Sequence, residues 1–201
     1  MILGKNDKKM HEKDLLDHAI ERFSALEKPA KSDLNLVRVF AQVERGLDEY
    51  RAKAKRMSVE ELEEEQHRSC MLARFLNASG DPKPHPKCHA HAIVSGAHKY
   101  AAELRAILAW HKLRIDDPDN GCWLPENTAA QAVMPPRLKN AVPHSRIHRY
   151  NYYFWLNGHI DPALNSTQEG LRSTLRMVAT RLQSGTQPAY VLNKKGVGLP
   201  V

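Results

Sequence analysis

The stretch "CHAHAIVSG", residues 88–96, decides how the rest of this chain is interpreted. Its β-branched pair Ile93-Val94 and the Ser-Gly that follows are typical of a short strand that ends in a turn. Histidines at the start of a strand are candidates for metal binding or proton transfer. His91 is such a candidate, and an alanine, Ala92, separates it from the aliphatic pair.

A helix and a turn follow this strand. Residues 97–115 place apolar side chains at helical spacing, and "DDPDNGCWLP" (116–125) then contains two turn signals, Asp-Pro and Asn-Gly. We therefore expect a tight turn headed by Asn120, followed by a short strand over residues 122–124. The two strands would flank an inserted helix.

A histidine pair occurs in the next helical stretch. "HSRIHRYNYYFWLNG" follows Pro143 and ends at Gly158, which are favoured residue types for the two ends of a helix. His144 and His148 are four residues apart, so on a helix both would project from one face. That spacing lets two imidazoles bind a single metal ion.

The first 78 residues are predicted to be helical. Apolar stripes run over residues 15–26 and 36–50, and Ser58 with Glu61 forms a capping box before a third helix. The turn-rich segment "NASGDPKPHPK" (77–87) then suggests a boundary. We expect a helical N-terminal region, residues 1–78, and a second domain, residues 79–201. Near the C-terminus, a capping box at Ser166 predicts a last helix, and residues 189–193 a short closing strand.

The composition narrows the functional classes. The 201 residues include 30 Lys and Arg against 23 Asp and Glu, a net charge of +7 that favours polyanionic partners such as nucleic acid. Three cysteines give no even-numbered disulfide framework. The N-terminus lacks the apolar core of a signal peptide, and no run approaches the roughly 20 apolar residues of a membrane span. We expect a soluble protein without a membrane partner.

The strand, turn and histidine pair together carry a family resemblance. The chain resembles the AHH group of the HNH/endonuclease VII nucleases over roughly residues 85–160. That group's pattern is Ala-His-His-Ile-Val, a helix, an Asn-Gly turn before Leu-Pro, and a helix with a histidine pair. The resemblance implies an α+β, predominantly helical fold, with a ββα-metal nuclease core beside the helical N-terminal region. The matching positions are Ala90, His91, Ile93, Val94, Asn120, His144 and His148.

The chain departs from the pattern where the group has its second histidine, which here is Ala92. By resemblance, the first histidine binds the metal and the second is the general base. Three explanations stay open. The base was replaced to disarm a toxic enzyme, which we favour; it has moved to a nearby side chain, with His89 or His98 as the candidates; or the register is shifted, so that His91 is the base and His89 a ligand.

The resemblance also implies the chemistry. His91, His144 and His148 would hold one divalent cation, with Mg²⁺ or Zn²⁺ as first candidates and Mn²⁺ or Ni²⁺ as others. A histidine at position 92 would take a proton from the attacking water, and Asn120 would orient it through its backbone. Without that base, we expect slow cutting. Four basic residues could contact phosphates without reading sequence: Arg137, Lys139, Arg146 and Arg149.

Two other functions compete with a DNA endonuclease. One is a non-catalytic, zinc-stabilised module that binds DNA or protein, with Cys88, His89, Cys122 and one histidine of the pair as ligands. The other is an RNase that uses the same metal site. Metal stoichiometry and thiol accessibility would distinguish the zinc module from the nuclease.

The resemblance further implies a biological setting. Members of the group are predicted DNases that often form the toxic domains of bacterial polymorphic toxins and type VI secretion effectors. We therefore expect an antibacterial toxin that acts on double-stranded DNA in the cytoplasm of a target cell. It would be exported through a secretion apparatus or a carrier module without a cleavable signal peptide. A cognate immunity protein, acidic to match a basic surface, is expected as its inhibitor.

Overall fold

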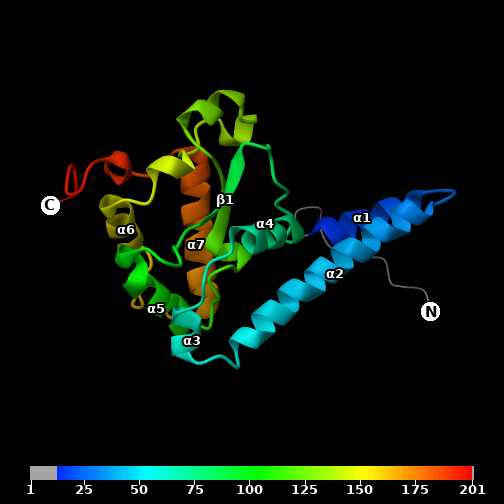
Figure 1. The fold of residues 1–201 in the computed structure, drawn as a ribbon, viewed down its shortest axis with the longest axis horizontal. Helices are drawn as coiled ribbons and strands as arrows, with labels where there is room; N and C mark the ends of the chain where they lie inside the picture. The colour runs from blue at the N-terminus through cyan, green and yellow to red at the C-terminus, as the bar shows by residue number, and fades with distance from the viewer. Residues whose placement is uncertain (1–12, 201) are drawn as a thin grey trace.

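The structure, a computed structural model, describes residues 13–200. It is a helical α+β fold with one small antiparallel sheet (Figure 1). The α-helices and strands, in chain order, are α1 (Leu15–Ala25), α2 (Lys31–Ala54), α3 (Val59–Glu63), α4 (Ser69–Ala78), β1 (Cys88–Ala92), α5 (Ala102–Trp110), β2 (Gly121–Pro125), α6 (Tyr150–Asn157) and α7 (Gln168–Ser184). Short 3₁₀ helices lie in the connections between β1 and α6 and in the segment after α7.

The sheet confirms the expected pair of strands around an inserted helix. β1 and β2 are antiparallel, with His91 opposite Cys122 and Ala92 opposite Gly121. Helix α5 lies between them in the sequence, preceded by the 3₁₀ helix η2 (Lys99–Ala101). A Cβ at Gly121 would lie 2.6 Å from Leu72 Cδ1. The glycine therefore lets α4 pack closely over the sheet.

The main core surrounds this sheet. Helix α4 packs on β1 and α7 packs on β2 (Figure 1). The apolar face of α7, which includes Leu171, Leu175 and Val178, is fully buried there. Trp123 of β2 is also buried, and its indole N–H donates to the Asp81 carbonyl at 2.9 Å. These contacts pack the two strands against one helix that precedes the sheet in the sequence and one that follows it.

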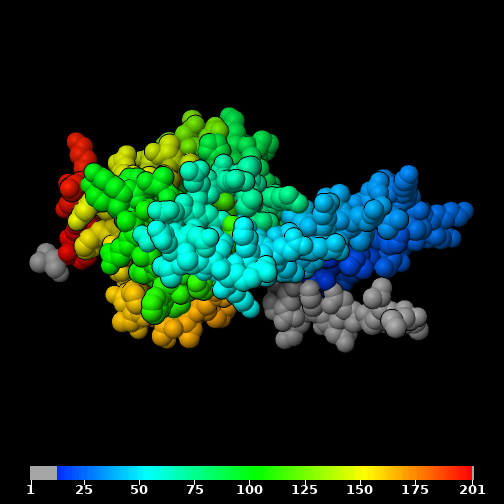
Figure 2. All heavy atoms as spheres, turned by 60° about the horizontal axis from the view of Figure 1, so that its bottom comes forward, coloured from blue at the N-terminus to red at the C-terminus, as the bar shows by residue number. Residues whose placement is uncertain are grey.

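Helices α1 and α2 form a hairpin that projects from the rest of the protein (Figure 1). We call residues 15–46 the arm and residues 47–200 the body. The space-filling view shows the arm extending away from the body (Figure 2). Within the arm only Asp17 and Ala19 are buried, whereas α2 buries Leu47, Tyr50 and Ala54 where it reaches the body.

A cluster of charged side chains fixes α2 to the body. Asp117 is buried and accepts paired hydrogen bonds from Arg51 of α2, at 2.9 and 3.0 Å, and from Arg172 of α7, at 2.9 and 3.0 Å. Asp119 also pairs with Arg172, at 2.5 Å, and with Arg176, at 3.2 Å. The loop before β2 thus joins α2 and α7, which are distant in the sequence.

Three local expectations were wrong. Residues 144–158 do not form one helix: they form the 3₁₀ helix η6 (His144–Arg146), an irregular step and then α6. The N-cap of α7 is Thr167, whose hydroxyl accepts from Gly170 N at 3.0 Å, and not Ser166. Residues 189–192 form the 3₁₀ helix η7 (Ala189–Leu192) and not a strand, because Val191 N and Asn193 N donate locally, to the carbonyls of Pro188 and Tyr190, instead of to a neighbouring strand.

The capping box at Ser58 is confirmed: its hydroxyl accepts from Glu61 N, and the Glu61 carboxylate accepts from Ser58 N. The division of the chain after residue 78 stays a prediction. Helix α4, which precedes that point, contributes Leu72 and Leu76 to the main core beside the sheet. Within residues 13–200, no helix is long and apolar enough to cross a membrane.

Candidate functional site

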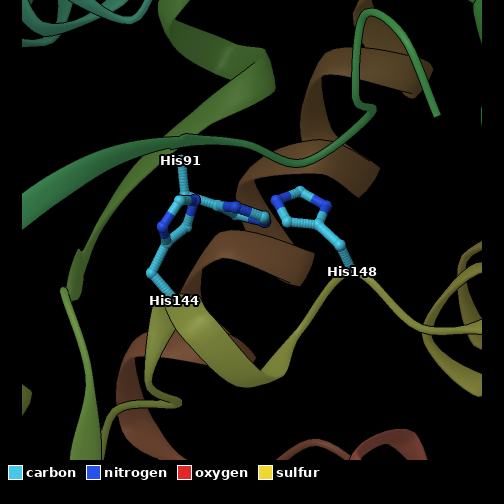
Figure 3. A group of neighbouring side chains, drawn as sticks. All are labelled: His91, His144 and His148. Carbon is cyan, nitrogen blue, oxygen red and sulfur yellow. The ribbon is translucent and has the colours of Figure 1, made fainter.

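Three histidines from separate segments meet at one point (Figure 3). His91 comes from β1, His144 from η6 and His148 from the step between η6 and α6. One ligand nitrogen of each lies within 4.8 Å of the others. The ring centroid of His91 is 5.3 Å from that of His144 and 5.1 Å from that of His148. The structure therefore brings together the three residues that the sequence predicted as ligands.

The pair His144 and His148 reaches the site through a bent segment instead of a regular helix. Pro143 begins the 3₁₀ turn, and buried Ile147 anchors its far side in the core. Ser145 N donates to the Glu126 carbonyl at 3.2 Å, which ties the turn to the end of β2. The four-residue spacing was thus a correct indication of convergence, although the helix assumed for it is absent.

The protonation of His91 follows from its hydrogen bonds. The Tyr152 hydroxyl donates to the Ile93 carbonyl at 2.8 Å, so its oxygen accepts from His91 Nε2–H at 3.1 Å. The other nitrogen, Nδ1, then carries no proton. It is buried and has no hydrogen-bond partner. A buried nitrogen lone pair that faces two other imidazoles fits a bound cation, because such a cation would satisfy it.

The remaining two imidazoles are also in the form that binds metal. His148 Nδ1 pairs with the Tyr153 hydroxyl at 3.1 Å, which leaves Nε2 for a ligand. Burial, together with the neighbouring histidines, lowers the pKa of His148 to about 4. The same causes lower the pKa values of His91 and His144. Since only neutral imidazole coordinates metal, the cluster is prepared for a divalent cation near neutral pH.

Asn120 holds the end of β1 in place. Its carbonyl accepts from Ile93 N and its side-chain oxygen accepts from Val94 N, both at 2.9 Å. Its amide group donates to the Val94 carbonyl at 3.2 Å and to the Ile115 carbonyl at 2.8 Å. Asn120 therefore sits beside position 92, where a family base would stand. Ala92 itself is buried at the wall of a cavity.

The two alternative bases differ in their surroundings. His98 caps η2 by accepting from Tyr100 N, and its ring stacks on Tyr153 at 4.6 Å. His89 has a half-exposed side chain, with its Nε2 3.8 Å from the Glu126 carboxylate. His98 is thus committed to a local structural role, and His89 lacks a close partner to orient it.

The four predicted phosphate-binding residues lie around the cluster in the sequence but are differently engaged. Arg137 pairs with Asp81 at 2.8 Å, and Arg149 donates to the Leu192 carbonyl at 3.1 Å. Lys139 and Arg146 are exposed. Their contact with a nucleic acid stays a prediction.

Sequence reasoning missed two parts of this site. His67, in the segment before α4, lines the same cavity as Ala92, and its Nδ1 lies 2.5 Å from Asp116 Oδ1. Nothing in the spacing of residues 67 and 116 indicated this pair. Tyr152, four residues after His148, orients His91, and nothing in its apolar surroundings in the sequence indicated this role.

A zinc site built on cysteines is not formed among residues 13–200. The only metal-binding group found there consists of His91, His144 and His148. Cys88 Sγ lies 3.4 Å from Met134 Sδ, and burial raises the pKa values of the Cys88 and Cys122 thiols. Both thiols are therefore protonated core groups, which argues against the zinc-module alternative.

Comparison with known proteins gives one match. Residues 72–182 match the AHH family, described as a nuclease family of the HNH/ENDO VII superfamily with conserved AHH. No curated protein and no solved structure shows a significant match. The matched range contains β1, β2 and all three histidines of the cluster.

Proposed function

This chain belongs to the AHH nuclease family of the HNH/ENDO VII superfamily, and we propose that it is a DNA endonuclease with little sequence preference. Membership of the family implies metal-dependent nuclease activity. The observation that carries the proposal is the unpartnered, buried Nδ1 of His91 beside two neutral imidazoles. A bound cation would satisfy this buried lone pair. Without a cation, the buried nitrogen has lost its hydration and gained no partner, which costs free energy.

The residues of the site have separate tasks. His91 Nδ1, one nitrogen of His144 and His148 Nε2 would hold the cation, while Tyr152 and Tyr153 fix the orientation of the first and the last ring. A bound divalent cation supplies Lewis-acid stabilisation of charge on the scissile phosphate and the departing 3′ oxygen. Its identity is open between Mg²⁺, Zn²⁺, Mn²⁺ and Ni²⁺.

Double-stranded DNA is the proposed substrate, with RNA as the alternative for the same chemistry. The net charge of +7 supports a polyanionic substrate in either case. The exposed residues Lys139 and Arg146 flank the cluster in the sequence and are the first candidates for phosphate contacts. Phosphate contacts position the substrate without reading its sequence.

The absence of a histidine at position 92 lowers the rate of DNA cutting that we expect. A chain in which no side chain replaces that base would cut more slowly by a factor of ~10²–10⁴. Ala92 lines a cavity of about 500 Å³, so there is space to introduce a histidine at this position.

The test is a nicking assay on supercoiled plasmid with Mg²⁺, and with chelator, using the unaltered chain with Ala92, which we call wild type, and Ala92→His. Cutting by Ala92→His that chelator abolishes, and that His148→Ala also abolishes, would support the nuclease and the ligand set together. If neither the wild type nor Ala92→His cuts DNA while both bind metal, the proposal is wrong. If the protein cuts RNA but not plasmid DNA, RNA replaces DNA as the substrate.

We also propose that the activity serves an antibacterial toxin or effector, such as those delivered by type VI secretion. The support is the motif resemblance to toxin domains, and no signal peptide is needed for such a route. In this proposal a secretion apparatus or carrier module exports the protein, and an immunity protein protects the producing cell. The N-terminal region, residues 1–78, would serve as a scaffold or as a partner-binding segment.

Expression in a bacterial cytoplasm tests this role. We expect growth arrest and degraded chromosomal DNA with Ala92→His and normal growth with Ala92→His/His148→Ala. Normal growth with both proteins at equal expression would contradict the toxin role without affecting the result of the plasmid assay.

A further inference from the structure

The cavity beside the histidine cluster has two walls from distant parts of the chain. One wall comes from β1 and the segment after it and includes Ala92 and Ser95, together with His144 and His148. The opposite wall comes from α4 and from the residue pair before it, and it includes His67. His67 therefore faces the same cavity as Ala92 and two histidines of the cluster.

His67 is held by a buried carboxylate. Its Nδ1 lies 2.5 Å from Asp116 Oδ1, and Asp116 is 1% exposed. Asp116 is fixed in turn because both its carboxylate oxygens accept from Arg68 N, at 3.2 and 3.0 Å, and its own N–H donates to the Tyr50 hydroxyl at 3.0 Å. With Nδ1–H donated to a carboxylate, the lone pair of His67 resides on Nε2.

The glycine at position 96 leaves space for His67 next to the segment that follows β1. A Cβ added to Gly96 would lie 2.8 Å from the Cβ and 3.0 Å from the backbone N of His67. Any side chain at residue 96 would therefore push the His67 segment away. The absence of a side chain at Gly96 lets His67 approach the end of β1 within a few residues of position 92.

We propose that His67 is the general base of this nuclease and replaces the family histidine that is missing at position 92. Asp116 is the positioning residue that selects its tautomer, as a buried carboxylate does in hydrolase triads. The inference rests on the proposed function, since it names the proton acceptor of that reaction. His67 is not within ligand distance of the three-histidine group and is free of that role.

The step balances as a hydrolysis. A water molecule gives one proton to His67 Nε2 while its oxygen forms a bond to phosphorus. The bond from phosphorus to the 3′ oxygen breaks, and that oxygen takes a proton from solvent. His67 then releases its proton to solvent, so one water and one phosphodiester give a 5′ phosphate and a 3′ hydroxyl.

Other histidines at the cavity are less suited to this role. His89 also lines it, but its side chain is 52% exposed and lies 3.8 Å from Glu126. His98 uses its Nδ1 as a helix cap. Only His67 combines access to the cavity with a buried carboxylate partner among the histidines of residues 13–200.

The experiment compares wild type, His67→Ala, His67→Gln, Ala92→His and His67→Ala/Ala92→His in the plasmid assay, with His18→Ala as the control in the arm. Calorimetry with Zn²⁺ measures metal affinity for each protein, and circular dichroism measures its fold. We expect the wild type to cut, both single His67 variants to lose ~10²–10⁴-fold in rate at unchanged metal affinity, and the double variant to recover. His18→Ala should match the wild type.

A second measurement does not depend on cutting. In the metal-free protein, ¹⁵N–¹H correlation spectra of the histidine rings should show His67 with a protonated Nδ1 and a bare Nε2. Asp116→Asn should disturb this tautomer and also reduce the cutting rate, whereas Glu126→Gln, beside His89, should do neither.

Each result decides the proposal. If the His67 variants cut as fast as wild type, or if they lose metal affinity, His67 is not the base, and the nuclease function stands. If the wild type is inactive and Ala92→His cuts, no substitute base exists, and the nuclease function again stands. If no variant cuts although all fold and bind metal, both proposals are wrong.

Discussion

The arm and the body are both built from amphipathic helices, but they differ in what those helices bury. In the body, the apolar side chains of α7 are completely buried: Leu171, Leu175, Val178 and Leu182. In the arm, the apolar residues of α1 and of the first half of α2 remain substantially exposed: Ile20 by 43%, Leu34 by 45%, Leu36 by 40% and Val39 by 53%. A periodic apolar pattern therefore predicts a helix without showing whether a core lies opposite it.

The difference also concerns charge. The body contains a buried ion cluster around Asp117, while in the arm the exposed Glu21 pairs with Lys13, which lies just before α1. Buried charges depend on their partners far more than exposed charges do. Stability and function should consequently respond to changes in the body and hardly to changes in the arm.

The largest effect should come from Asp117→Ala. It leaves Arg172, which is 9% exposed, and Arg51 without their main partner, so we expect a loss of ~3–5 kcal/mol in the free energy of unfolding. The matched change in the arm, Glu21→Ala, should cost about 0.2–1 kcal/mol. Urea unfolding of the two variants measures both values. Equal losses would show that the arm is as tightly coupled as the body.

A second pair compares apolar side chains of the same type. Leu175→Ala removes a completely buried side chain from the main core and should cost ~2–5 kcal/mol. Leu36→Ala, at a 40% exposed position in the arm, should change stability by about 0.5 kcal/mol or less. Thermal unfolding provides the comparison. A large loss for Leu36→Ala would indicate that the arm packs against something that this chain alone does not provide.

The third change affects metal binding. Tyr152→Phe removes the hydrogen bond that fixes the His91 tautomer, so metal affinity should fall by about 10–100-fold. Tyr150→Phe changes a ring that contacts Tyr100 and Lys195 and not the histidine cluster, and should leave the affinity unchanged. Calorimetric titration with Zn²⁺ measures both. An unaffected Tyr152→Phe would show that the hydroxyl does not orient His91.

The smallest effect is a dependence on pH that separates two sites within the body, the histidine cluster and the ion cluster at Asp117. The folded-state pKa of His148 is about 4, and that of His91 is also lowered by burial, against about 6.5 for an unfolded histidine. The unfolded chain therefore binds more protons, and the metal-free body should lose stability as the pH falls from 6.5 to 4. Thermal unfolding from pH 7 to 4 measures this loss.

The joint of α2 with the body, at Asp117, provides the contrast at acid pH. Burial alone would raise the pKa of Asp117, but hydrogen bonds from Arg51 and Arg172 outweigh it and lower that pKa. Its contribution should persist to about pH 4 and be lost only below it. Hydrogen exchange resolved by segment would show the α2 joint still protected at pH 5, where the histidine cluster is already weakened. Loss of both together would contradict this order.

Sequence reasoning was strongest where chemistry and local turn signals coincide. Asn120 and Gly121 indicated the turn before β2, and the β-branched pair after the two histidines indicated β1. Their positions follow from short-range rules. The three histidines that the structure brings together could be predicted as ligands because each belongs to such a local pattern.

What could not be predicted depends on contacts between distant segments. The pairing of His67 with Asp116 spans 49 residues, and that of Arg51 with Asp117 spans 66. Both arise because α2 and α4 pack against the loop before β2, and no short pattern contains that information. The bent route of residues 144–148 was missed for a related reason: buried Ile147 and the bond from Ser145 to Glu126 override helical spacing.

The joint at Asp117 gives the long helix a mechanical meaning. With 24 residues, α2 is about 36 Å long, and its last turns are clamped at Arg51 while its first turns project from the body. The helix can act as a lever that pivots at Asp117. Asp117 lies three residues before Asn120, whose side chain holds the segment that follows β1. A torque applied at the tip of the arm therefore acts on the loop before β2, which also holds the end of β1 so that His91 faces His144 and His148.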